Sequence, residues 1–552
     1  MKHFKKLGAP LYSIHEYPSL SEQEQRFKNA GWQQAHARSL WDLWSDDGYV
    51  SSSLRSSLDA VEPFDEWEEF ALFASHYFLL VASTSQGELH HSAEKTEQSG
   101  QAADVSSQFA LLARSPAGGG QRRFGALVPD GEHSFGYHAG LGRQTRLATT
   151  DLYSIANDIP GPTLPFPSRK VPARMCHTVT HLANGDCLLV GGRASPAAGL
   201  QDCWLRQGTQ WRPTQNLPVP RFRHSATRVT LDSNHVLVYG GKTSDGTVLD
   251  VWLLWSGNED GWRPVETVGS TPRARFGACL ASIDNESGFL FGGIGADGIV
   301  IEDFWTWKLH QRSDGSYYLE LHDETERLRA SPLFEYISRF GATATCSSWG
   351  LVIVGGIIPR QVVPYDKEIM LVDPTALASC LAGETPQPSD VLSAVGLGLN
   401  FGGPRPLLVG HASYAVDPNQ VLVLGGGAVC FSFGTFWTEG TWLLKRVDAE
   451  TPENRWNLVP ESAQTSKVEE LLSVNPSGVD NQAPKDIAPI PRVKVQTAAQ
   501  FQQILADGKP VIIERSDLGP CTERWTREYL ADAVGRDRKV EAIDPACAEE
   551  TG

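Results

Sequence analysis

Apolar runs that end in a pair of glycines recur five times through the middle of this sequence. The pairs are Gly191-Gly192, Gly240-Gly241, Gly292-Gly293, Gly355-Gly356 and Gly425-Gly426. A tryptophan follows four of them at a nearly fixed offset, namely Trp204, Trp252, Trp305 and Trp437. β-prone runs closed by glycines predict strands followed by a backbone conformation or a close approach that side chains prevent. The pattern therefore predicts a repeated small sheet.

A short basic or aromatic segment opens each copy of this repeat. The openings are Arg174-Met175-Cys176-His177, Arg223-His224-Ser225, Arg275-Phe276-Gly277-Ala278, Arg339-Phe340-Gly341-Ala342 and Gly410-His411-Ala412. A sixth, degenerate copy begins at Arg123-Phe124-Gly125-Ala126. Because one small sheet cannot bury both of its faces, neighbouring copies must stack around an axis.

The spacing of these copies is that of kelch blades. Residues 121–447 divided by six give roughly 54 residues per copy, close to the ~50 of a kelch repeat. We therefore predict a mainly β fold, a six-bladed kelch β-propeller. The tryptophans are expected to pack between adjacent blades rather than to bind a ligand.

The segment before the propeller, residues 1–84, predicts helices and a strand. Ser21-Glu22-Gln23-Glu24 is a candidate capping box for a helix that ends near Gly31. A second helix is expected through residues 65–73, with acidic residues in its first turn, where the helix dipole favours them. The apolar run at residues 76–82 predicts a buried strand. Such a segment has too little apolar surface to fold alone.

Charge and cysteine usage narrow the class of protein. The formal net charge of −17 argues against non-specific nucleic-acid binding by the whole surface. Nine scattered cysteines indicate reduced thiols, and the N-terminus lacks the apolar core of a signal peptide, so a cytoplasmic location is expected. Arginines nevertheless cluster around the predicted propeller opening, and most of them are interpreted as solvated loop residues: Arg122, Arg123, Arg143, Arg146, Arg169 and Arg174.

Two phrases of the first segment resemble a known enzyme family. Residues 58–70, followed by Ser75-His76-Tyr77-Phe78-Leu79-Leu80, are similar to the C-terminal end of the leucine carboxyl methyltransferase family. The kelch-bearing branch of that family uses S-adenosyl-L-methionine. It methylates and then methoxycarbonylates a tricyclic guanosine derivative at position 37 of phenylalanine tRNA, in wybutosine biosynthesis. The resemblance implies the same cofactor, the same RNA partner and no membrane.

One feature of that family is missing. Residues 1–90 contain Gly8, Gly31, Gly48 and Gly87, none in the strand–glycine–helix turn that holds such a cofactor. Residues 1–84 are therefore interpreted as the C-terminal remnant of an α/β methyltransferase-like domain. We expect no cofactor-binding residues in this chain and an inactive chain on its own, with a missing core either lost from the gene prediction or supplied separately.

The candidate substrate-binding residues follow from the resemblance and from the arginine cluster. They are Arg26, Asp65, Glu66, His76, Tyr77, Arg122, Arg123 and Arg174. Each also has a plainer interpretation. The acidic turn at residues 65–69, which also includes Glu68 and Glu69, is typical of a solvated helix end. His76 before an apolar strand is typical of a structural histidine, and Arg26 of an exposed helix residue.

The remaining tracts complete the predicted organisation. Residues 85–120 and 448–490 are expected to be linkers, because they are polar and rich in small residues or proline. Residues 491–552 resemble the start of a JmjC-type cupin domain, with a helix at 497–505 and a strand near 511–513. No histidine follows His411, so no iron-binding triad can form and no metal site is expected.

Two further hypotheses concern how the propeller is used. Insertions around residues 311–333 and 374–407 predict either an RNA-facing platform or tolerated loop growth. The alternative to a tRNA-modifying transferase is a non-enzymatic kelch adaptor that binds protein partners through its loops. A glycine-rich cofactor turn encoded upstream would favour the transferase, and its absence the adaptor.

Overall fold

The computed structural model describes most of the propeller tract and parts of its flanks. It covers residues 15–85, 109–114, 121–156, 171–395, 406–446, 455–459, 491–507, 511–514 and 529, apart from gaps at 62–63, 65, 130–133, 144, 209, 232, 258–260, 382–387, 431–433 and 439–440. The chain divides into two compact units, Met1–Ser473 and Val474–Gly552.

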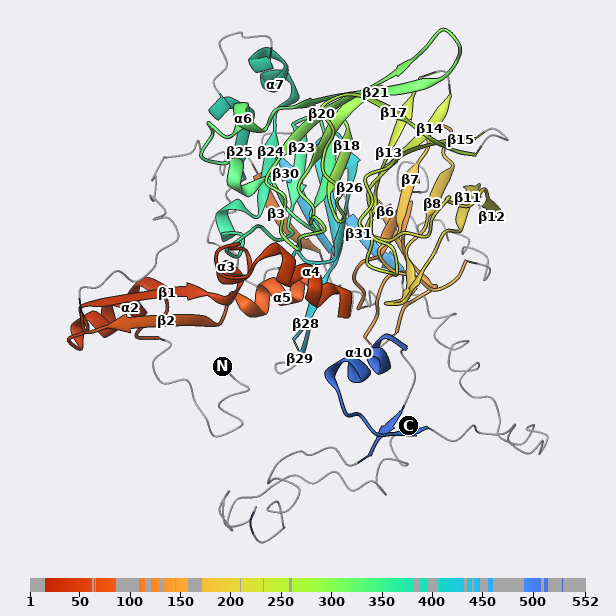
Figure 1. Ribbon diagram of the computed structural model, residues 1–552. Coiled ribbons are helices and arrows are strands. Elements are labelled where there is room, and N and C mark those ends of the chain that lie inside the picture. Colours follow the sequence, from red (N-terminus) through yellow and green to blue (C-terminus); the bar gives the residue numbers. More distant parts are fainter. Residues whose placement is uncertain are drawn as a thin grey trace. The chain divides into compact units, whose positions relative to one another are not determined.

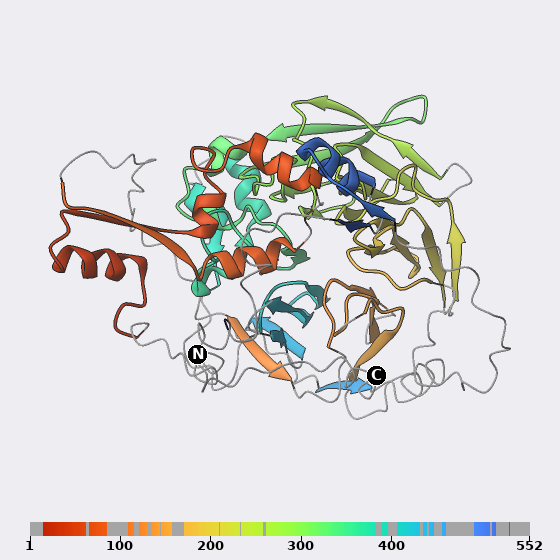
Figure 2. The same ribbon diagram turned by 60° about the horizontal axis from the view of Figure 1, so that its bottom comes forward.

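Within the described residues of the first unit, six antiparallel sheets form the blades of a β-propeller (Figures 1 and 2). From the innermost strand outward, the first blade consists of β4 (Ala126–Pro129), β5 (Ser134–His138), β6 (Thr150–Ala156) and β31 (Arg455–Val459). The second consists of β7 (Thr178–His181), β8 (Cys187–Val190), β11 (Cys203–Gln207) and β12 (Gln210–Thr214). The third consists of β13 (Ser225–Thr230), β14 (Asn234–Tyr239), β15 (Trp252–Ser256) and β16 (Trp262–Pro264).

The other three blades follow the same plan. The fourth consists of β18 (Cys279–Ser282), β19 (Ser287–Phe291), β20 (Phe304–Gln311) and β21 (Tyr317–Asp323), with the parallel strand β17 (Glu266–Gly269) outside. The fifth consists of β22 (Thr343–Ser347), β23 (Gly350–Val354), β24 (Ile369–Val372) and β25 (Leu392–Ala394). The sixth consists of β26 (His411–Asp417), β27 (Gln420–Gly425), β30 (Thr441–Arg446) and β3 (Phe109–Arg114). The inner strands contact one another in the cyclic order β4, β7, β13, β18, β22, β26 and β4 again. The predicted six-bladed ring is confirmed.

The ring is closed by strands from both ends of the propeller tract. β3 pairs with β30 as the outermost strand of the last blade, and β31 pairs with β6 as the outermost strand of the first. Both strands lie in tracts that the sequence predicted as linkers, so the propeller extends beyond residues 121–447 on each side.

An arginine at the start of four of the copies is a structural residue, and in the copy that the sequence opened at Arg223 this residue is Arg221. The guanidinium groups of Arg174, Arg221, Arg275 and Arg339 are buried and donate to the carbonyl oxygens of Gly191, Gly240, Gly292 and Gly355, the first glycines of four pairs. Arg174 and Arg275 also bind Asp202 and Asp303, each at 2.6 Å. At Gly292, φ is +64° and an added Cβ would lie 2.1 Å from the Arg339 carbonyl oxygen, which explains why glycine is needed there.

Aromatic and imidazole groups join neighbouring blades. Trp252 and Trp305 lie in one buried cluster shared by the third and fourth blades, which confirms the predicted packing role for these two tryptophans. His224 Nε2 lies 2.9 Å from Thr178 Oγ1 of the preceding blade, and His411 repeats this contact with Thr343 at 3.0 Å. Burial lowers the pKa of His224 to about 3 and that of His411 to about 4, so both imidazoles are neutral near pH 7.

The described parts of the predicted insertions contain helices and strands. The tract at 311–333 comprises a longer β20–β21 hairpin and α6 (Thr325–Leu328). The tract at 374–407 includes α7 (Pro374–Leu381), α8 (Pro388–Val391) and the outer strand β25 of the fifth blade. Part of this extra length therefore builds a blade.

The N-terminal segment folds into α2 (Leu20–Asn29), β1 (Gln34–Ser39), α3 (Leu40–Trp44), α4 (Ser52–Val61), α5 (Trp67–Ala74) and β2 (Phe78–Ser83). The capping box of α2 is formed by Ser19 and Glu22, two residues before the predicted one, because Ser19 is the residue in extended conformation at the helix start. Gly31 follows the helix at φ +97°, as predicted for its end.

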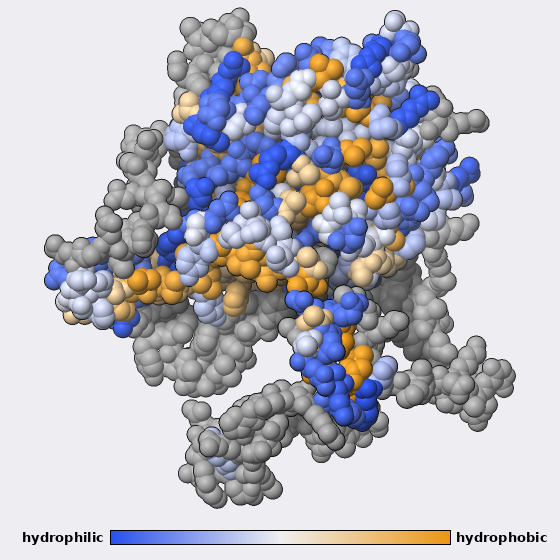
Figure 3. Space-filling view, in the orientation of Figure 1, coloured by the Kyte–Doolittle hydropathy of each residue, from blue (hydrophilic) through white to orange (hydrophobic). Residues whose placement is uncertain are grey.

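The strand β2 differs from its prediction. It pairs with β1, but its apolar side chains are exposed, including Phe78 at 41% and Val81 at 45% (Figure 3). The sequence predicted a buried strand from the apolar run. The run is present, but the helix beside this two-stranded sheet, α2, packs mainly against β1 and leaves most of β2 uncovered.

The second unit contains α10 (Ala498–Asp507), β32 (Arg492–Val493) and β33 (Ile512–Ile513), the two strands being parallel. The helix and strand predicted here are confirmed, whereas most of residues 515–552 lies outside the described residues. No helix within the described ranges has the length and apolar character required to cross a bilayer.

Candidate functional site at the axial opening of the propeller

Helices α3 and α5 lie against one face of the propeller, which we call the α5 face (Figure 2). This face carries the loops that join the second and third strands of each blade. Trp41 Nε1 donates to the carbonyl oxygen of Ile358 at 2.9 Å, and Trp44 Nε1 to that of Gly298 at 3.2 Å. Both acceptors belong to such loops, so the indoles fix the helices across two blades.

Apolar side chains fill the contact beneath the helices. The buried cluster contains Trp41, Trp67, Ala71 and Ala74 from the helices and Phe276, Ile294, Val300, Phe340 and Ile357 from the propeller. Phe276 and Phe340 are the aromatic residues of two repeat openings. The aromatic position of the repeat therefore serves as the floor on which the helices pack.

A buried ion pair fixes the start of α5 to the propeller. Glu68 is fully buried, and its carboxylate accepts hydrogen bonds from both terminal nitrogens of Arg223, at 2.6 and 2.9 Å. The Arg223 guanidinium lies 4.8 Å from the ring centres of both Phe124 and Phe340. A Cβ at Gly341 would stand 2.5 Å from Glu68 Oε1, so the carboxylate occupies space that only glycine leaves open.

A second carboxylate lies beside the first. Glu69 is buried and pairs with Arg123, while its Oε2 has no hydrogen-bond partner in the described structure. Burial, together with the neighbouring charge of Glu68, raises the pKa of Glu69 to about 7, although Arg123 and Arg223 oppose the shift. Glu68 and Glu69 therefore lie beside the same arginines, but both oxygens of the Glu68 carboxylate accept hydrogen bonds, whereas Oε2 of Glu69 accepts none within the described residues.

The raised pKa of Glu69 has a measurable consequence for stability. The folded state holds this proton more tightly than the unfolded chain, so stability falls as pH rises from about 4.5 to about 7. Glu69→Gln removes this dependence. We expect the free energy of unfolding of the variant, minus that of the wild type, to increase across that window by at most about 1.4 kcal/mol per pH unit.

This difference is measured by denaturant unfolding of both proteins between pH 4 and pH 8. Glu66→Gln is the matched control, because Glu66 is only half-buried and has no ion pair among the described residues. A Glu69→Gln difference that stays constant with pH would contradict the raised pKa.

Two further cations tie the N-terminal segment to the same face. Lys242 is buried, and its Nζ lies 2.8 Å from both carboxylate oxygens of Asp59. Arg55 is buried on α4, donates to the carbonyl oxygen of Asp297 at 2.6 Å and pairs with Asp47. Because unpaired buried charges are strongly destabilising, these contacts specify where the segment binds.

Of the predicted substrate-binding arginines near the opening, the structure places only one in the site. Arg123 lies in the site, whereas Arg122 and Arg174 are buried within their blades, where Arg122 pairs with Asp151 at 2.6 Å. The interpretation of these three arginines as solvated loop residues is therefore wrong, because all of them are buried. The substrate-binding role predicted for these arginines stays untested.

The other predicted residues are not gathered at the opening. Arg26 is exposed, 5.1 Å from the Tyr17 ring, and His76 Nδ1 lies 2.5 Å from the Leu72 carbonyl oxygen at the end of α5. Tyr77 is exposed and Glu66 half-buried, whereas Asp65 lies outside the described residues. The interpretation of Glu68 and Glu69 as solvated is wrong, because both are buried against arginines.

Sequence reasoning missed the roles of Glu68, Arg223 and Lys242. The sequence predicted Arg223 as the start of its copy, which is wrong, because the equivalent of Arg275 and Arg339 is Arg221. Arg223 therefore stands two residues later, where the other two copies have Gly277 and Gly341. A residue that departs from the repeat at a fixed position is a candidate for a role other than building the blade.

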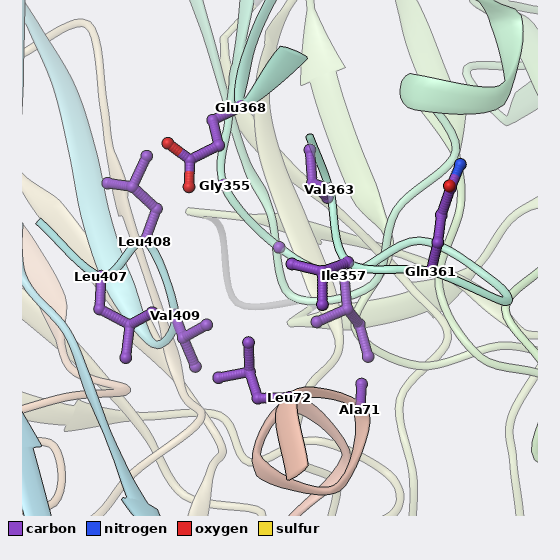
Figure 4. Close-up of a pocket in the computed structure, with 12 residues that line it drawn as sticks. Ala71, Leu72, Gly355, Ile357, Gln361, Val363, Glu368, Leu407, Leu408 and Val409 are labelled. Carbon is purple, nitrogen blue, oxygen red and sulfur yellow. The ribbon is translucent and has the colours of Figure 1, made fainter. Parts of the chain in front are cut away.

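Two cavities lie near the axis. The smaller cavity has a volume of about 60 Å³ and lies between Ala71 and Leu72 of α5 and the loops at 355–363 and 407–409 (Figure 4). It holds a few waters at most and is too small for a nucleoside. The larger, about 570 Å³, is lined by β13, β18, β22 and β26, with Thr227 and Ser282 oxygens 2.8 Å apart. It can hold water or a small polar molecule.

Comparison with known proteins relates the propeller to one family. Residues 171–440 match the family model described as tRNA wybutosine-synthesizing protein 4, beta-propeller. The protein named tRNA wybutosine-synthesizing protein 4 in Aspergillus oryzae is 62% identical over 546 residues, covering 98% of this chain and 53% of the relative. The proteins of that name in Aspergillus fumigatus and Emericella nidulans are 62% and 54% identical, covering 98% of this chain and 51% and 53% of their own length. The chain thus spans about half the length of these curated relatives.

Proposed function

Because this chain belongs, through its propeller, to the tRNA wybutosine-synthesizing protein 4 family, we propose that it takes part in wybutosine modification of tRNA. The identity of 62% across 98% of the chain supports this role. The proposal includes a cytoplasmic location, which suits the thiols of Cys176, Cys203, Cys279 and Cys346, for which no disulfide is found among the described residues.

The finer proposal is the reaction implied by the methyltransferase resemblance. It is S-adenosyl-L-methionine-dependent methylation and methoxycarbonylation of a guanosine derivative at position 37 of phenylalanine tRNA. The described residues do not fit that cofactor. Gly31 follows a helix, an added Cβ there would meet nothing within 4 Å, and no described N-terminal strand leads through glycines into a helix. No chemical step is therefore assigned to this chain's own residues.

The observation that carries the proposal is the buried attachment of α5 to the axial opening. Glu68, Glu69 and Asp59 pair with Arg223, Arg123 and Lys242, so the N-terminal segment has one defined position on the propeller. Methyl transfer to a carboxylate depends mainly on alignment and on exclusion of water. We propose that the propeller supplies the alignment by holding both the transferase segment and the RNA.

A chimera tests this function. In Aspergillus oryzae, the segment of the relative that matches this chain is replaced by residues 1–552, and tRNA nucleosides are analysed by liquid chromatography and mass spectrometry. We expect wybutosine at the level of the parent strain. A strain lacking the relative is the negative control.

Loss of wybutosine in a strain whose chimera is present at normal abundance would contradict the proposal. A chimera in which residues 109–459 are deleted separates the platform role from an adaptor role. Unchanged wybutosine after that deletion would show that the propeller is dispensable for modification and would favour a protein-binding adaptor.

A further inference from the structure

The two faces of the propeller differ in charge. On the face opposite α5, the turns that join the first and second strands of five blades comprise residues 182–186, 231–235, 283–287, 347–350 and 417–420, and these segments contain no lysine or arginine. They carry carboxylates instead, among them Asp186, Asp284, Glu286 and Asp417. These turns therefore offer no basic residue to a polyanion such as RNA.

The α5 face carries the arginines, and most of the exposed ones are neutralised locally. Arg273 binds Asp297 at 2.6 Å, and Arg360 binds Glu302 at 3.2 Å. The loop between β5 and β6 is different, because residues 139–149 contain Arg143 and Arg146 and no acidic residue. Neither guanidinium has a hydrogen bond or an ion pair within the part of the chain that the structure describes.

Arg146 lies at the edge of the axial opening. Its backbone pairs with that of Leu141 across the loop, and Leu141 packs with Phe124 and Cys176 in one cluster. The Nε atom of Arg146 is buried without a hydrogen-bond partner, and burial lowers the pKa of Arg146. An anion at this position would complete the guanidinium's hydrogen bonding and offset the cost of desolvation.

We propose that the phosphate backbone of tRNA contacts the α5 face at the β5–β6 loop, where Arg143 and Arg146 bind phosphates. The inference rests on the proposed function and adds which face meets RNA and through which residues. Neither arginine of this loop has a carboxylate partner among the described residues, so RNA binding there is compatible with the net charge of −17. The neighbouring Arg123, Arg223 and Lys242 are already occupied by the N-terminal segment.

The test is binding of fluorescein-labelled tRNA to the full chain, followed by fluorescence anisotropy over a series of salt concentrations. Arg143→Gln/Arg146→Gln removes two positive charges from the loop. Arg273→Gln/Arg360→Gln removes two from ion pairs on the same face and is the matched control. We expect the first variant to bind about tenfold more weakly near 0.1 M salt, with the salt slope reduced by about 1.5 to 2. The control should stay within about twofold of the wild type.

Several outcomes would overturn the inference. Equal losses in the two double variants would indicate a general effect of charge, and no loss in either would exclude the loop. Absence of tRNA binding by the wild-type chain would also overturn it, while the chimera could still form wybutosine, so the two proposals fail separately. Equal competition by polyglutamate and by unlabelled tRNA would assign the loop to an acidic protein. Unchanged thermal unfolding of both variants confirms that they remain folded.

Discussion

Replacing Glu68 by alanine is expected to release α5 from the propeller. The substitution leaves the Arg223 guanidinium buried between two aromatic rings without a counter-ion. Removing one partner of a buried ion pair typically costs about 3–5 kcal/mol. We expect amide hydrogens of residues 67–74 to exchange at least 100-fold faster, which corresponds to about 2.7 kcal/mol or more at about 1.4 kcal/mol per factor of ten. Hydrogen exchange followed by mass spectrometry measures this directly.

The control for this prediction is Glu66→Ala, two residues earlier in the chain and only half-buried. It should leave exchange in α5 within about threefold of the wild type. The double variant Glu68→Ala/Arg223→Ala should recover part of the loss, because it removes the uncompensated charge as well. Equal exchange in the Glu68→Ala and Glu66→Ala proteins would show that the ion pair does not hold the helix.

The blades could be predicted because their signals repeat. In four of the copies an arginine and the glycine pair after the second strand recur together, since the guanidinium donates to the carbonyl oxygen of the first glycine. A residue needed to build a blade must occur in most blades. Arg122 and Arg174 occupy that repeated position, which accounts for their burial in the fold.

The site could be predicted only in part, because its residues are individual departures from the repeat. Arg123 and Arg223 stand where other copies have other residue types, and their partners lie 54 and 155 positions away in sequence. An acidic first turn satisfies the helix dipole equally well in solvent or against an arginine. Local sequence therefore could not reveal that Glu68 and Glu69 are buried.

The ring-closing strands were missed for a related reason. β3 and β31 have five or six residues each and lie next to polar tracts rich in small residues, without the glycine pair that marks the other strands. Each is specified by pairing with a strand about 300 residues away. Such a strand has no local periodicity long enough to be distinguished from a linker.

Removing β31 is expected to destabilise the propeller and to promote self-association. In a chain that ends at residue 446, β6 loses its partner along five residue pairs and becomes an exposed edge. With a net contribution of about 0.5–1.5 kcal/mol for each hydrogen bond, the loss is on the order of a few kcal/mol. Differential scanning calorimetry should show a melting temperature lower by several degrees, and light scattering should show species larger than the monomer.

A chain that ends at residue 459 is the matched control, because it differs only by the segment that contains β31. It should melt like the full chain, since the residues beyond it that the structure describes belong to the second unit. If the two truncated chains melted together and both remained monomeric, the pairing of β31 with β6 would not contribute to closure. If only the shorter chain is destabilised, the boundary of the propeller lies at residue 459, and the attachment of the N-terminal segment depends on a ring closed by both of its flanks.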